Sequence, residues 1–127
     1  MNENRPIVLV VDDAPSNVDV LKNILFTEYK VKVAISGEIA LKAAEKEPRP
    51  DIILLDVIMP VMDGFEVCRR LKANQLTAAI PVIFVTGTAD DYDLLKARSL
   101  GAVGFIMKPL ESVKVLEAVK NALETEK

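Results

Sequence analysis

The sequence predicts an α/β fold in which helices cover both faces of a parallel sheet. Short, mostly unbroken runs of Val, Ile and Leu occur five times, and each is followed by a segment whose apolar residues have helical spacing. Unbroken apolar runs are typical of strands that are buried on both faces. Because right-handed crossovers leave few topologies, the most frequent arrangement at this size is a doubly wound (βα)5 sheet with strand order 2-1-3-4-5.

Local signals place each strand and helix along the chain. The strands are predicted at residues 7–12, 31–35, 52–56, 82–86 and 103–107, and the helices at 15–28, 38–46, from 63 onward, at 90–100 and at 112–124. Pro15 is suited to the first turn of its helix. Asp63 and Glu66 have the spacing of a capping box, and Gly101 is suited to a left-handed cap after the fourth helix.

Composition and charge exclude several classes of function. We expect residues 1–127 to form a single domain, because no linker or internal repeat divides the chain. The net charge is −3 and no basic run is present, which argues against direct nucleic-acid binding. No apolar stretch approaches the ~20 residues of a membrane span. The polar first residues do not resemble a signal peptide, so we expect a cytoplasmic location.

The chain has no histidine and a single cysteine. The absence of histidine removes the Ser-His and Cys-His nucleophile pairs and the commonest nitrogen ligand for metals. Cys68 lies among apolar helix residues, where a buried packing thiol is the expected role. Oxygen-ligand metal chemistry remains as the plausible option.

Polar residues stand at the ends of four predicted strands. Asp12 and Asp13 close the first, Asp56 ends the third, and Thr86 and Lys108 close the fourth and fifth. In the order 2-1-3-4-5, the first and third strands are neighbours at the point where the strand order reverses, and a crevice opens at their carboxyl ends. We therefore expect the three acids to meet there, with the threonine and the lysine lining the same crevice.

Three crowded carboxylates repel one another unless a cation offsets them. Mg²⁺ (or Mn²⁺) suits such a site, since it takes oxygen ligands and keeps several waters; two carboxylates and a backbone carbonyl such as that of Ile58 would suffice. Lys108 and the Thr86 hydroxyl could then bind phosphate oxygens. Asp56 is the candidate nucleophile, because a carboxylate can form an aspartyl phosphate when metal and lysine stabilise the transferring group.

Residues 5–125 resemble a receiver domain of the response regulators of bacterial two-component signalling. The segments that carry the resemblance are Val10-Val11-Asp12-Asp13, Leu54-Leu55-Asp56-Val57-Ile58-Met59-Pro60, Met62-Asp63-Gly64, Val85-Thr86-Gly87 and Gly104-Phe105-Ile106-Met107-Lys108-Pro109. Each segment alone is weak evidence. Their occurrence together, in order and mostly at predicted strand ends, makes chance agreement improbable.

The resemblance implies a role for each acid. Asp56 matches the phosphoacceptor, which takes a phosphoryl group from the phosphohistidine of a sensor histidine kinase or phosphotransfer protein. Asp13 resembles the direct Mg²⁺ ligand, Asp12 the acid that holds a metal-bound water, and the Ile58 carbonyl the third protein ligand beside Asp56. The family catalyses only its own phosphorylation and dephosphorylation, so we do not expect a conventional enzyme.

The resemblance also implies a switch. Lys108 matches the lysine that pairs with the phosphoryl oxygens, and Pro109 the proline that follows a cis peptide bond. Thr86 is similar to the hydroxyl residue that moves toward the phosphoryl group, and Phe105 to the aromatic residue that rotates inward behind it. The face formed by the fourth helix, fifth strand and fifth helix would then change and regulate an output domain or partner protein.

Two other classes of function share parts of this pattern. A hydrolytic phosphatase could use Asp56 as its nucleophile, but it would need a second acid at the position of Ile58 and a lid. A flavodoxin-like FMN-binding module has the same topology. Its phosphate loop after the first strand should be rich in Ser, Thr and Gly, whereas Asp12 and Asp13 would repel phosphate.

Overall fold

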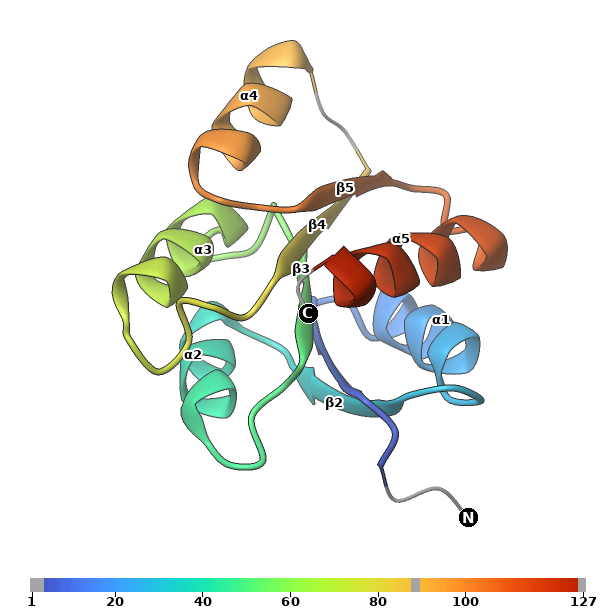
Figure 1. The fold of residues 1–127 in the computed structure, drawn as a ribbon. Helices are drawn as coiled ribbons and strands as arrows, with labels where there is room; N and C mark the ends of the chain where they lie inside the picture. The colour runs from blue at the N-terminus through green and yellow to red at the C-terminus, as the bar shows by residue number, and fades with distance from the viewer. Residues whose placement is uncertain (1–3, 88–89, 126–127) are drawn as a thin grey trace.

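The computed structural model, which describes residues 4–87 and 90–125, contains a five-stranded parallel sheet between two layers of helices (Figure 1). The strands are β1 (Ile7–Val11), β2 (Lys30–Ala34), β3 (Ile52–Asp56), β4 (Val82–Thr86) and β5 (Gly104–Met107). Their order is β2-β1-β3-β4-β5, and every neighbouring pair is parallel. The predicted doubly wound α/β fold and its strand order are confirmed.

Five helices cover the sheet. They are α1 (Pro15–Leu25), α2 (Gly37–Glu45), α3 (Gly64–Ala73), α4 (Asp91–Ser99) and α5 (Ser112–Thr125). Side chains of α2, α3 and α4 join one hydrophobic cluster and side chains of α1 and α5 join the other, so the two groups of helices lie on opposite faces of the sheet (Figure 1). None of the helices in the described ranges is long and apolar enough to cross a membrane.

The central strands supply both hydrophobic clusters at once. On β1, Leu9 and Val11 face the α2–α3 side, whereas Val8 and Val10 face the α1–α5 side, as the alternation of side chains along a strand requires. β3 and β4 are likewise buried along their whole length. The sequence predicts strands that are buried on both faces, but the edge strand β2 is only partly buried, and its Lys32 donates a hydrogen bond to the Pro48 carbonyl.

Two predicted helix features are wrong in detail. α1 ends at Leu25 rather than residue 28, because the chain turns to bury the Tyr29 ring and the Tyr29 N–H donates to the Leu25 carbonyl. Asp63 caps α3 by accepting from the Glu66 N–H. The Glu66 carboxylate does not complete the capping box, since it pairs with two arginines of the next turn, Arg69 and Arg70.

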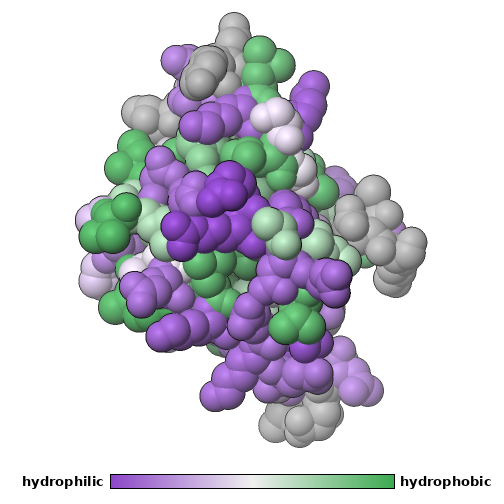
Figure 2. Space-filling model, turned by 90° about the vertical axis from the view of Figure 1, so that its left-hand side faces the viewer, coloured by the Kyte–Doolittle hydropathy of each residue, from purple (hydrophilic) through white to green (hydrophobic). Residues whose placement is uncertain are grey.

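The outer surface on the α2–α3 side is mostly hydrophilic, with apolar side chains scattered between polar ones (Figure 2). The ion pairs of Glu66 with Arg69 and Arg70 belong to this exposed layer, with nitrogen to oxygen distances of 2.6 and 2.7 Å. Exposed ion pairs of this kind add little to stability. The stability of this layer therefore comes from the inner face of α3, where Val67, Cys68 and Leu71 are buried as predicted.

Two residues have a positive φ among those described. Gly101, at φ 92°, ends α4 in the left-handed region as predicted. Val61, at φ 71°, was not predicted, and it is the centre of a tight turn in which the Met62 N–H donates to the Pro60 carbonyl. A β-branched residue is strained in this region. The Val61 side chain is fully exposed and so gains no packing that would offset the strain.

Replacement of Val61 by glycine should stabilise the chain. The strain of a non-glycine residue at this φ costs about 1–3 kcal/mol, which the substitution would relieve. The larger conformational entropy of glycine in the unfolded chain opposes this gain by about 0.5–1 kcal/mol. We expect the free energy of unfolding to rise by about 1 kcal/mol, measured by urea unfolding followed by circular dichroism. Gly101→Ala is the matched opposite and should lower it; a loss of stability in Val61→Gly would contradict the strain argument.

Candidate functional site

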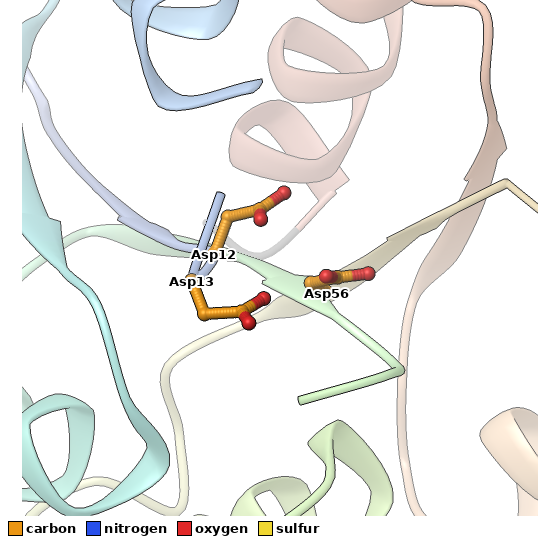
Figure 3. A group of neighbouring side chains, drawn as sticks. All are labelled: Asp12, Asp13 and Asp56. Carbon is orange, nitrogen blue, oxygen red and sulfur yellow. The ribbon is translucent and has the colours of Figure 1, made fainter. Parts of the chain in front are cut away.

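The carboxyl ends of β1 and β3 bring three acids together. Val11 and Leu55 are paired across the two strands, so the residues that follow them, Asp12 and Asp56, leave the sheet side by side. One carboxylate oxygen of each of Asp12, Asp13 and Asp56 lies within 4.8 Å of the others (Figure 3). The structure thus places the three acids together at the strand ends, as the predicted topology requires.

The acids differ in their surroundings. Asp12 and Asp56 are buried, with 1% and 6% of their surface exposed, whereas Asp13 is exposed at the mouth of the site. One oxygen of Asp12, Oδ1, accepts a hydrogen bond of 2.9 Å from the Ala14 N–H. Its other oxygen, Oδ2, is buried and has no hydrogen-bond donor within the described part of the chain. Such an oxygen favours a nearby cation.

Lys108 supplies one positive charge to this cluster. Its Nζ lies 3.5 Å from Asp12 Oδ2 and 3.9 Å from Asp56 Oδ1. The Lys108 N–H donates to the Thr86 carbonyl at 2.8 Å, which fixes the chain as it leaves β5. The Lys108–Pro109 peptide bond is cis, as the resemblance implied. One ammonium group cannot balance three ionised carboxylates, so the site keeps an excess of negative charge.

The pKa of Asp56 is raised to about 6, and burial is the largest cause. The neighbouring Asp12 carboxylate is the second cause, because two like charges in a confined site oppose each other's ionisation. Lys108 and a hydrogen bond from the Ile58 N–H act in the opposite direction, and Asp13 adds a smaller repulsion. The site therefore holds Asp56 close to the point at which it gains or loses a proton near neutral pH.

Thr86 and Phe105 lie on the two strands beyond Asp56. Thr86 is buried at the end of β4 and follows Val85, the residue paired with Asp56. Phe105 is half-buried on β5 opposite Phe84, with 6.0 Å between the ring centroids. The two predicted switch residues are therefore in neighbouring strands, Thr86 in β4 and Phe105 in the edge strand β5.

The sequence did not reveal the backbone N–H groups that donate hydrogen bonds to the acids. The Ala14 and Ile58 N–H groups orient the carboxylates of Asp12 and Asp56. Every residue except proline carries an N–H group, so no residue type signals this role. The Ile58 side chain is 66% exposed, which leaves its backbone as the part that touches the site.

These residues fit a hard divalent cation. They offer carboxylate oxygens from three acids, and the buried Asp12 Oδ2 lacks a hydrogen-bond donor among the described residues. Oxygen donors of this kind suit Mg²⁺ or Mn²⁺ rather than a soft metal. The fold and this acidic cluster define an α/β protein with a candidate cation site at the point where the strand order reverses.

Comparison with known proteins identifies the family. Residues 8–120 match the family model described as response regulator receiver domain, which is nearly the whole chain. The chain belongs to this family, whose members act in two-component signalling.

The similarity extends to curated proteins and solved structures. The chain is 43% identical over 115 residues to the response regulator PleD of Caulobacter vibrioides, covering 90% of this chain and 25% of that protein. It thus spans about a quarter of that relative's length. The chemotaxis protein CheY4 of Vibrio cholerae has a TM-score of 0.88 at 29% identity and covers 93% of this chain and 98% of its own.

A third comparison concerns a structure with a bound metal. The receiver domain of the sensor histidine kinase PA1611 from Pseudomonas aeruginosa has a TM-score of 0.86 at 26% identity, covering 94% of this chain and 98% of that one. That structure is described as having a magnesium ion coordinated in its active site cleft.

The stability of the chain should fall as the pH rises through 6. The folded-state pKa of Asp56, about 6, lies above that of an unfolded aspartate, so the folded chain binds more protons between the two values. The resulting stability is fully present below about pH 4 and lost above the folded pKa, and it amounts to about 2–3 kcal/mol. Without divalent metal, Asp56→Asn should therefore be more stable than the wild type above about pH 7.

Urea unfolding of both chains at low and at neutral pH measures this difference. The advantage of Asp56→Asn should disappear in acid, where the wild-type carboxyl is protonated. Asp19→Asn removes the same charge from an exposed position on α1 and is the matched control. An equal advantage at both pH values would show that the burial of the ionised Asp56 carboxylate and its repulsion by Asp12 are not the cause.

Proposed function

We propose that the chain is a phosphorylation-controlled switch in which Asp56 accepts a phosphoryl group in a Mg²⁺-dependent reaction. The observation that carries the proposal is the buried cluster of Asp12 and Asp56 with the Lys108 ammonium 3.5 and 3.9 Å away. A nucleophile, a cation site and a lysine are the parts that phosphoryl transfer to a carboxylate needs. The magnesium described in the PA1611 receiver domain supports the same assignment.

Each residue has a role in the proposed reaction. Asp13, Asp56 and the Ile58 carbonyl would hold the metal directly, and Asp12 would hold it through a water. Bound Mg²⁺ would supply positive charge for the phosphoryl oxygens and lower the repulsion among the acids. Lys108 would move from the Asp12 and Asp56 oxygens to a phosphoryl oxygen, where its charge offsets the negative charge that the group brings.

Asp56 acts as the nucleophile in its ionised form. One carboxylate oxygen attacks the phosphorus atom of a phosphohistidine, the phosphorus–nitrogen bond breaks, and its electron pair returns to the imidazole. The raised pKa of Asp56 means that Lys108 and a bound cation both assist the reaction by favouring the ionised form. These 127 residues contain no histidine, so the phosphohistidine must lie outside them, on a sensor histidine kinase or a phosphotransfer protein.

The phosphoryl group would then change the neighbouring strands. It offers a strong acceptor to the Thr86 hydroxyl at the end of β4. Movement of Thr86 would open space beside β5 into which the half-buried Phe105 ring can turn. The face formed by α4, β5 and α5 would thereby shift between two pre-existing arrangements. An output domain or partner protein would bind one of the arrangements in preference to the other.

Acetyl phosphate provides a direct test of the reaction. With Mg²⁺, the wild-type chain should gain one phosphoryl group, detected by intact mass spectrometry, because Asp56 can attack a small acyl phosphate as it attacks a phosphohistidine. The adduct should be absent without Mg²⁺ and in Asp56→Asn. Failure of the folded wild-type chain to form it would contradict the proposed function, and an adduct retained in Asp56→Asn would contradict the assigned nucleophile.

The role of Lys108 has its own prediction. Lys108→Gln should slow labelling by acetyl phosphate by roughly 100-fold, the usual effect of losing one preorganised donor to a transferring group. Lys114→Gln is the matched control, because Lys114 is exposed on α5 and pairs with Glu111 at 2.9 Å. The initial labelling rate at saturating Mg²⁺ is the measurement. Similar rates for both variants would exclude Lys108 from the reaction.

A further inference from the structure

The first residue of α3 lies directly against the backbone of Asp56. A Cβ atom on Gly64 would stand 2.1 Å from the Asp56 carbonyl oxygen and 2.9 Å from both the Asp56 carbonyl carbon and the Val57 Cα. These are backbone atoms, which cannot rotate away as the end of a side chain can. A single methyl group at residue 64 therefore requires that either the helix or the Asp56–Val57 peptide move.

This close approach is not general to the glycines near the site. A Cβ on Gly87, which follows Thr86, would have its nearest neighbour at 3.9 Å, the Cδ of Lys108, which is ordinary contact. The reason for a glycine at residue 64 also differs from that at residue 101, where a φ of 92° favours glycine. The constraint at Gly64 is the space between a helix and the backbone of the proposed phosphoacceptor.

Two contacts prevent the helix from moving away. The Gly64 N–H donates a hydrogen bond of 2.7 Å to the Val57 carbonyl. The next residue, Phe65, is buried and packs its ring edge-on against Phe84 of β4, with 5.2 Å between the centroids. A shift of α3 away from the site would break the hydrogen bond and separate the rings. The displacement caused by a Cβ would therefore fall largely on the Asp56–Val57 peptide.

That peptide leads into the groups that carry the proposed chemistry. The Ile58 N–H donates to the Asp56 carboxylate, and the Ile58 carbonyl is the proposed backbone ligand of the metal. We propose that Gly64 is a positioning residue: its missing side chain lets α3 support the backbone from Asp56 to Ile58, and so sets both the nucleophile and the metal site. This inference rests on the proposed function of the site.

Phosphorylation kinetics of Gly64→Ala test the inference. The labelling rate with acetyl phosphate is measured over a range of Mg²⁺ concentrations, in variants whose folding is verified by circular dichroism. Gly64→Ala should lower the maximal rate and raise the Mg²⁺ concentration for half-maximal rate, with a combined loss of about 10- to 100-fold, as expected for a reacting group misplaced by about 1 Å.

A variant in the same helix separates positioning from stability. Leu71→Ala removes a buried side chain from the last turn of α3, away from Asp56, and destabilises the fold without adding any atom. Under conditions where both variants are folded, Leu71→Ala should keep its rate and its Mg²⁺ dependence close to those of the wild type. The inference is overturned if Gly64→Ala behaves as the wild type does, or if Leu71→Ala loses as much as Gly64→Ala.

Hydrogen exchange on the unmodified chain provides a second test, which decides the matter if Gly64→Ala does not fold. Binding of Mg²⁺ should slow exchange of the Gly64 N–H relative to that of Leu71, because the metal would tighten the backbone that accepts the Gly64 hydrogen bond. An unchanged ratio at Mg²⁺ concentrations that saturate labelling would overturn the inference. If the wild type takes no label at all, the proposed function fails, which is distinct from a labelled wild type with an equally active Gly64→Ala.

Discussion

The burial of two carboxylates beside a single lysine is the constraint on which the rest of the site depends. Asp12 and Asp56 are almost fully buried, and the Lys108 ammonium lies within 4 Å of an oxygen of each. Burial and, to a smaller extent, repulsion by Asp12 raise the pKa of Asp56. One oxygen of Asp12 is buried without a hydrogen-bond donor among the described residues. The site is therefore least stable when it is fully ionised without added positive charge, and a bound cation relieves that cost.

The sheet divides the rigid parts of the site from those that can change at low cost. The acids leave β1 and β3, which are buried along their whole length and supply both hydrophobic clusters. Lys108 and Phe105 belong to the region of β5, an edge strand that is only partly buried. Movement of an edge strand exposes less buried apolar area to water than movement of a central strand does. Lys108 and Phe105, two of the three side chains that are proposed to move, are thus on or beside an edge strand, whereas the third, Thr86, ends the buried strand β4.

The sequence was sufficient to predict the sheet and the proximity of the three acids, because the strands follow from the apolar periodicity and the position of the acids follows from the strand order. β3 and β4 have the predicted bounds, and Asp12 and Asp56 lie together as the strand order requires. It was insufficient where tertiary contacts compete with local signals. Glu66 has capping-box spacing, yet its carboxylate pairs with Arg69 and Arg70. The strained φ of Val61 has no signature in residue type, and the glycine at residue 64 does not by itself reveal that it approaches the Asp56 carbonyl.

Two kinds of interaction, one observed and one proposed, connect the site with α4 and β5, and they contribute different free energies. One is a line of aromatic rings, in which Phe65 packs on Phe84 and Phe84 on Phe105, with Lys96 of α4 4.6 Å above the Phe65 ring. Each such ring contact contributes about 0.5–1.5 kcal/mol and is present before any phosphorylation.

The other connection is the proposed bond from the Thr86 hydroxyl to a phosphoryl oxygen. A hydrogen bond to a charged group contributes about 1.5–3 kcal/mol and would exist in only one of the two states. Only a difference between states can shift an equilibrium. The threonine would therefore bias the switch, whereas the rings would transmit the resulting movement of β5 to the start of α3, where Gly64 supports the backbone of Asp56.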